Sequence, residues 1–143
     1  MGYYVDTQET VFNIAADKIT EAFEALKKLN HDDEKKTSGL FGIGMKNSEP
    51  SFRWMDENYD TQAKDLKDIF DMLGFDGDYE EDGSYVLYGY SDKTGDEEIF
   101  LREVAPYVTA GSYIIWQGED GSLWKMVFDG ESMAILEGKV IFM

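Results

Sequence analysis

The spacing of apolar and polar positions divides the start of the chain into a strand followed by a helix. Residues 4–14 are rich in β-branched and aromatic side chains and partly alternate, which predicts a strand with a bend near Gln8. Residues 17–29 place apolar side chains three and four positions apart, which predicts an amphipathic helix. Asp17 stands where the N-cap of that helix is expected.

Two further helices are predicted by the same spacing. Apolar side chains recur at helical intervals over residues 61–73, with Asp60 or Thr61 in the capping position. Gly74 follows directly, where a left-handed glycine usually closes a helix. Acidic residues open a third helix later in the chain, and Pro106 should end it, because proline cannot continue the hydrogen-bonded ladder.

Between the second and third of these helices, the spacing of apolar positions shortens to a period of two. Residues 75–80 and 84–90 read as two strands around an acidic turn that contains glycine, so a hairpin is expected. Strict alternation would place Val86, Tyr88 and Tyr90 on one face of the second strand.

The last third of the chain consists of short apolar runs separated by Asp-Gly and Glu-Gly turns, which predicts a β-meander. The expected strands cover residues 112–117, 123–128, 133–136 and 139–142. Trp116 and Trp124 fall on neighbouring strands, and we expect them to form a cross-strand pair that stabilises the sheet.

The predicted order is therefore β-α-loop-α-β-β-α-β-β-β in a single domain of residues 1–143. Strands joined by hairpins favour an antiparallel sheet, and the apolar stripes of the helices have to be buried against it. We expect an α+β fold, an antiparallel sheet with helices on one face, ferredoxin-like and elaborated by a C-terminal β-meander. Residues 30–60 show no sustained period and are expected to form a long irregular loop.

The chain is strongly acidic, and its acidic residues are unevenly distributed along the sequence. Thirty acidic residues against 13 basic ones give a net charge of −17, and residues 56–103 alone hold 16 of the acids and four of the bases. Such a chain repels nucleic acids and anionic membranes, so we expect neither as a direct partner. Basic proteins or cations are the partners that this charge favours, and the alternative interpretation is that the acidity only keeps the protein soluble.

Candidate chemistry is sparse. The absence of cysteine excludes disulfides, thiolate metal ligands and cysteine nucleophiles. The single histidine, His31, lies in a run of mixed charge, so neither a multi-histidine metal site nor a histidine-based catalytic triad is expected. The glycines at 39–44 lack the Gly-Lys-Ser/Thr ending of a phosphate-binding loop. We therefore expect no enzyme, no catalytic residue and no cofactor.

One acidic stretch superficially follows the spacing of a calcium-binding loop. Asp78, Glu80 and Asp82 alternate, and Gly83 stands at the sixth position, where such loops turn sharply. Gly89 then occupies the twelfth position, where a bidentate glutamate is required, and the flanking segments read as strands. No dedicated metal site is expected.

Residues 97–108, together with the motifs at 111–114 and 118–124, resemble a pattern in small uncharacterised acidic proteins of bacteria and their phages. The resemblance implies a bacterial or mobile-element setting and carries no assigned activity. The N-terminus has no basic and apolar leader, and no run approaches the ~20 apolar residues that span a bilayer. A location in the cytoplasm of a bacterial host cell is therefore expected.

Our leading hypothesis is a non-enzymatic phage or mobile-element inhibitor that occupies a basic nucleic-acid-binding surface of a host protein, as anti-restriction and anti-CRISPR inhibitors do. Its carboxylates would stand in for phosphates. The predicted partner-binding residues are Asp65, Asp68, Asp71, Asp76, Asp78, Glu80, Glu81 and Asp82.

Two alternatives use other parts of the sequence. A small-ligand or peptide-binding module would use a cleft under residues 39–55, with Phe41, Phe52 and Trp54 as its gate. A self-associating accessory protein would form a homodimer through an exposed strand edge or the apolar loop.

Overall fold

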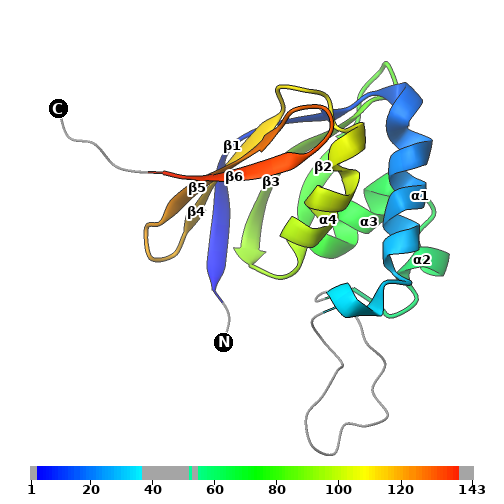
Figure 1. The fold of residues 1–143 in the computed structure, drawn as a ribbon, viewed down its shortest axis with the longest axis horizontal. Coiled ribbons are helices and arrows are strands. Elements are labelled where there is room, and N and C mark those ends of the chain that lie inside the picture. Colours follow the sequence, from blue (N-terminus) through cyan, green and yellow to red (C-terminus); the bar gives the residue numbers. More distant parts are fainter. Residues whose placement is uncertain (1–2, 37–51, 53–54, 139–143) are drawn as a thin grey trace, which may run out of the picture.

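The computed structural model of the chain describes residues 3–36, Phe52 and residues 55–138 (Figure 1). Its strands are β1 (Tyr4–Ile14), β2 (Phe75–Tyr79), β3 (Tyr85–Lys93), β4 (Tyr113–Gly118), β5 (Leu123–Phe128) and β6 (Met133–Glu137). Its helices are α1 (Ile19–Leu29), α2 (Tyr59–Gln62), α3 (Leu66–Leu73) and α4 (Glu97–Val104). Single turns of 3-10 helix cover Ala16–Lys18, Asp33–Lys35 and Ala105–Tyr107.

The six strands form one antiparallel sheet in the order β2-β3-β1-β4-β5-β6. The first strand of the chain therefore lies in the interior of the sheet, while β2 and β6 are its edges among the described residues. Figure 1 shows the helices gathered on one side of the sheet. Side chains of β4 alternate between buried and half-buried, as expected when one face of a strand packs against helices. The predicted α+β class with an antiparallel sheet is confirmed.

The core between sheet and helices is rich in aromatic rings. Phe70 of α3 stacks on Tyr85 of β3 with ring centroids 5.5 Å apart, and it also meets Phe12 of β1 at 6.2 Å. Phe12 in turn contacts Phe128 of β5 at 5.3 Å, so one chain of rings joins a helix to three strands. Complete burial of each such ring stabilises the fold by roughly 1.5–3 kcal/mol.

The predicted bend in the first strand is confirmed. The pairing of β1 with β4 shifts register between Thr7 and Glu9, so Gln8 is an extra residue on β1. Such a bulge increases the local twist of a strand. Here it allows β1 to follow the curvature of the sheet over 11 residues.

A second irregularity overturns the prediction that Val86, Tyr88 and Tyr90 share a face. The pairing of β2 with β3 shifts register between Asp76 and Gly77, and this shift leaves Tyr88 without a partner across the strand pair. Tyr88 is 59% exposed, whereas Tyr90 is 4% exposed and belongs to the core. The bulge inserts one residue, so every side chain beyond it changes face.

The single helix predicted over residues 61–73 is wrong, because the chain forms α2 and α3 with a break between them. Ala63 has an extended backbone, and so has Asp65, whose side chain accepts the N–H of Asp68 at 2.9 Å. Asp65 is thus the N-cap of α3, in place of Asp60 or Thr61. An aspartate side chain that bonds backbone N–H groups offers the chain an alternative to continuous helix.

Helix ends elsewhere agree in part with expectation. Gly74 closes α3 with φ of 107°, in the left-handed region, as predicted. Helix α4 ends at Val104, and Pro106 lies in the 3-10 turn that follows it, also as predicted. The expected cap at Asp17 is wrong, since this residue lies inside a 3-10 turn and α1 begins without a side-chain cap.

The three meander strands β4, β5 and β6 lie close to their predicted bounds. Gly121 and Gly130 take positive φ values of 88° and 95° in the turns between them, where other residues would be strained. The further strand predicted over residues 139–142 lies outside the described residues.

Candidate partner-binding surface

The eight predicted partner-binding carboxylates come from one continuous piece of the fold. They lie on α3 and its cap, on the edge strand β2, and in the turn to β3, and we call this set the acidic rim (Asp65, Asp68, Asp71, Asp76, Asp78, Glu80, Glu81 and Asp82). Helix α3 leads into β2 through the single residue Gly74 and packs against it. The rim therefore follows one edge of the sheet. With Lys64 and Lys67, residues 64–83 carry eight acids and two bases, a net charge of −6.

Several members of the rim already have structural roles. Asp65 caps α3, and the carboxylate of Asp68 accepts the backbone N–H of Lys64 at 2.7 Å. Asp71 forms an ion pair with Lys67, one turn earlier on the same helix, at 3.0 Å. The three aspartates of the helix thus stabilise its first turns as well as contributing charge.

The strand and turn contribute a second group. Asp78 accepts the backbone N–H of Tyr79 at 2.8 Å, and Asp82 accepts both the N–H and the hydroxyl of Ser84 at 2.9 and 2.6 Å. Asp76, Glu80 and Glu81 are exposed, and no hydrogen bond or ion pair of their carboxylates is present within the described residues. These three are the rim carboxylates most readily available to a partner.

The charges of helix and strand act on the same groups. The hydrogen bond to Asp71 raises the pKa of Lys67, and the charges of Asp71, Asp78 and Asp65 raise it further. Burial raises the pKa of Tyr79, with a further contribution from Asp65 and Asp68. Asp78 of β2 and the aspartates of α3 therefore form one local negative field. The bonds from Ser84 lower the pKa of Asp82, which keeps that carboxylate ionised.

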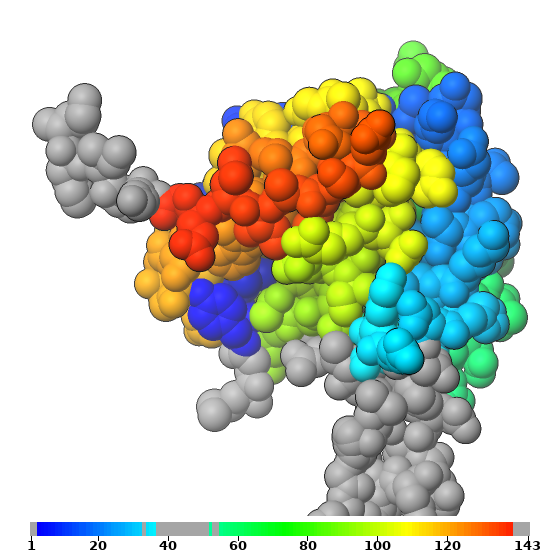
Figure 2. Space-filling model, viewed as in Figure 1, coloured from blue at the N-terminus to red at the C-terminus, as the bar shows by residue number. Residues whose placement is uncertain are grey.

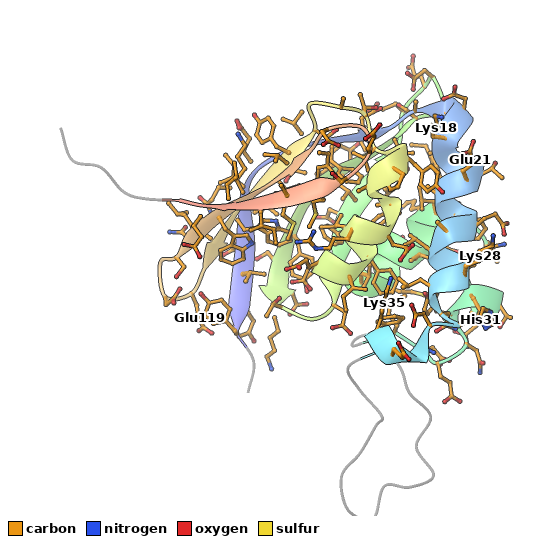
Figure 3. The ribbon with its side chains drawn as sticks, viewed as in Figure 1. Lys18, Glu21, Lys28, His31, Lys35 and Glu119 are labelled. Carbon is orange, nitrogen blue, oxygen red and sulfur yellow. The ribbon has the colours of Figure 1, made fainter. Side chains whose placement is uncertain are left out.

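His31 lies beyond the C-terminal end of α1, as Figure 3 shows. Its Nε2 is 3.2 Å from a carboxylate oxygen of Asp60, and Asn30 donates to the other oxygen of Asp60 at 2.7 Å. These contacts attach the end of α1 to α2. Within the described residues, the side chain of His31 pairs with this carboxylate and with no nucleophile, so the geometry indicates a structural role.

The proposed gate of the ligand cleft is only partly described. Phe41, Trp54 and the glycines of residues 39–44 lie outside the described residues. Phe52 is 1% exposed and packs against Phe100 and Tyr59, with ring centroids 4.9 and 6.3 Å away. The side chain of Phe52 is therefore a core residue.

The calcium-like spacing does not assemble a site. Asp78 lies on a strand and Asp82 lies in a turn. The hydroxyl of Ser84 already donates a hydrogen bond to one oxygen of Asp82. Within the described part of the chain, no group of three or more His, Cys, Asp or Glu side chains is arranged to hold a metal ion.

The predicted tryptophan pair is confirmed. Trp116 and Trp124 lie directly opposite each other on β4 and β5, with nearly parallel rings and centroids 6.3 Å apart. Trp116 is 1% exposed, whereas Trp124 is only partly buried.

Sequence reasoning missed two surface grooves. One, of about 490 Å³, runs along α1 towards Tyr107, where Lys35 pairs with Asp32 and Glu103 at 3.7 and 3.3 Å. Its lining holds four acidic residues and two lysines, of which Glu21, Lys28 and Lys35 are labelled in Figure 3. The other, of about 540 Å³, lies between the start of α4 and strands β5 and β6. Both join residues far apart in the chain, so no local pattern could have indicated them.

Comparisons with protein-family models, with curated proteins and with solved structures found no match to this chain. None of the helices in the described ranges has the length and hydropathy needed to cross a bilayer.

Proposed function

We propose that this chain is a non-enzymatic binding protein whose acidic rim occupies a basic, nucleic-acid-binding surface of another protein. The observation that carries the proposal is the net charge of −6 along one edge of the sheet. Closely spaced carboxylates on a rigid frame present negative charge to a partner much as a phosphate backbone does, and they accelerate association with a basic surface.

The position of the rim supports this function. Strand β2 has five residues and carries Asp76 and Asp78 on its exposed side, which discourages another strand from pairing with it. The same charges remain accessible to a partner that approaches the edge through side chains. Asp76, Glu80 and Glu81 have no internal partner in the described structure, so a basic partner could engage them without breaking existing bonds.

The setting we propose is a phage or another mobile element, with the partner being a nucleic-acid-processing protein of the bacterial host. An inhibitor of the anti-restriction or anti-CRISPR type would act in the cytoplasm and need no cofactor. The support for this setting is the sequence resemblance together with the local charge.

We also propose that the fold is an elaborated ferredoxin-like one. Strands β2-β3-β1-β4 are adjacent in this order, and helices connect β1 to β2 and β3 to β4, as in a split β-α-β arrangement. Strands β5 and β6 would then be the C-terminal addition. This arrangement leaves the β2 edge uncovered by the meander, where the acidic rim lies.

The test is a pull-down from bacterial lysate at two salt concentrations, with a triple variant that keeps the internal bonds of the rim. Asp76→Asn, Glu80→Gln and Glu81→Gln remove three charges from the rim. The matched control, Asp17→Asn, Glu21→Gln and Glu131→Gln, removes three exposed charges elsewhere. We expect nucleic-acid-binding proteins to be captured, to be released by salt and by added duplex DNA, and to be lost with the rim variant alone.

Capture that is indifferent to salt, to DNA and to the rim variant would refute the proposal. So would equal losses in the two triple variants, since these would indicate an effect of net charge without a defined surface.

A further inference from the structure

The groove beside α4 combines an apolar floor with carboxylates along its border. It lies between the N-terminal end of α4 and the helix-facing side of β5 and β6, and its volume is about 540 Å³. Trp124, Met126 and Ile135 form its floor. Figure 2 shows β6, in red, beside the yellow-green residues around the start of α4. The groove lies at the opposite edge of the sheet from the acidic rim.

The floor is the end of an aromatic row that crosses the sheet. Tyr90 contacts Trp116 with centroids 5.6 Å apart, and Trp116 stacks on Trp124 at 6.3 Å with an angle of 6° between the rings. The inner members are buried, so the row is anchored in the core. Trp124 is partly exposed and contributes indole surface to the groove. An indole held by a stacked neighbour is a preorganised aromatic surface.

Three glutamates surround this floor, and two of them are already engaged. Glu97 accepts hydrogen bonds from Thr94 and Gly95, and it is 6% exposed. Glu98 pairs with Arg102 at 3.1 Å.

Glu137 is different. It lies directly opposite Trp124 in the β5–β6 pairing, so the two side chains share the face of the sheet that lines the groove. Its carboxylate is exposed and forms no hydrogen bond or ion pair within residues 3–36, Phe52 and 55–138. An indole and an unengaged carboxylate therefore lie side by side, which is the pair of groups that recognises a planar cation.

We propose that this groove binds an arginine side chain of a partner protein. A guanidinium group stacks on an indole and forms two parallel hydrogen bonds with one carboxylate, so Trp124 and Glu137 can act on it together. The aliphatic part of the side chain lies over Ile135 and Met126, which shields apolar surface from water. A lysine ammonium, a compact and strongly hydrated charge, gains less from the indole. This inference is independent of the acidic rim, and either can fail alone.

The experiment is an NMR titration of the full chain with the probe peptide acetyl-Gly-Arg-Gly-amide. We expect shifts of the Trp124 indole N–H and of backbone amides at Gly95, Glu98 and Glu137, with a dissociation constant on the order of 1 mM. The peptide with citrulline in place of arginine has the same shape and no charge, and it should cause no such shifts. The lysine peptide should bind about threefold more weakly.

Variants separate the groove from general attraction to an acidic protein. Glu137→Gln should weaken binding about fivefold, and Trp124→Leu should weaken it by at least as much. Glu131→Gln, an equal change of charge at an exposed position outside the groove, should leave binding unchanged. Trp124→Leu also alters packing. Glu137→Gln changes an exposed side chain and therefore tests binding in the groove without disturbing the core.

The proposal is overturned if the arginine and citrulline peptides shift the same signals equally, or if the shifts follow the acidic rim. It is also overturned if Glu137→Gln and Glu131→Gln weaken binding equally. Absence of any shift at the highest peptide concentration would contradict the proposal as well.

Discussion

Asp65 allows the structural and electrostatic roles of the acidic rim to be separated by two substitutions at one position. Its side chain accepts the N–H of Asp68 at 2.9 Å and so satisfies one of the free donors at the start of α3. Asp65→Ala removes both the charge and the cap. Asp65→Asn removes the charge alone, because an asparagine oxygen caps a helix about as well as an aspartate oxygen.

The loss of a cap usually costs about 1 kcal/mol. Helix α3 has eight residues, and Leu66 in its first turn is fully buried, so fraying that turn also exposes core. We therefore expect Asp65→Ala to lower the free energy of unfolding by roughly 1–2 kcal/mol. For a chain of this length, the midpoint of thermal unfolding should fall by about 3–6 °C. Asp65→Asn should change the free energy by no more than about 0.5 kcal/mol, because a weakened interaction with the helix dipole is offset by reduced repulsion among the rim carboxylates.

Urea denaturation followed by circular dichroism measures both variants, with equal slopes as the sign that the unfolded ensembles are comparable. If both variants lose the same stability, charge matters here and capping does not. If neither loses any, Asp65 is not the cap and the break between α2 and α3 has another cause. Partner binding should weaken equally in both, since both remove one charge from the rim.

Three further predictions concern stability. Gly77→Ala should destabilise the fold by about 1–3 kcal/mol, because a Cβ at this position would lie 2.7 Å from a backbone oxygen and would also overlap the Tyr85 hydroxyl. Adding Tyr85→Phe removes that hydroxyl, which is buried without a partner in the described structure, and should restore part of the lost stability in urea titrations. Burial raises the pKa of both Tyr59 and Tyr85, so their stabilising contribution is complete below pH ~10 and is lost as pH rises further; tyrosinate absorbance should appear together with unfolding, and a gradual titration of all tyrosines in folded protein would contradict this. Ser84 lowers the pKa of Asp82, so Ser84→Ala should reduce stability above pH ~4 and have a diminishing effect as the pH falls below that value, as measured by thermal unfolding across pH.

Local patterns were sufficient to predict most elements of this fold. The alternation of residues 4–14, the glycine after Leu73 and the Asp-Gly turns of the meander each act over a few residues, and the structure follows them. The strand pairing β2-β3 and β4-β5-β6 follows from the same turns.

The incorrect predictions concern positions at which a distant or competing contact determines the local structure. Tyr90 changes face because of a bulge that depends on how β3 pairs with its neighbouring strands, and strict alternation cannot indicate it. The break at residues 63–65 depends on whether Asp65 bonds to the backbone or faces solvent, and the apolar spacing is the same in both cases.

The acidic rim was predictable because its residues are contiguous in sequence, so their gathering needs no long-range information. Trp124 was also recognised, as half of a stacked pair. The groove was not, because Glu137 and Glu98 meet Trp124 only after β6 has paired with β5 and α4 has packed beside them.

The interior position of β1 has a consequence for the order of events during synthesis. This strand leaves the ribosome before its neighbours β3 and β4, which are separated from it by about 70 to 110 residues of chain. Until both have been made, β1 lacks at least one of its two neighbouring strands, so the burial of Val5, Phe12 and Ile14 stays incomplete. A nascent chain that stalls before β4 should therefore be held by chaperones or degraded, because the sheet cannot close on both sides of its earliest strand until β4 has emerged.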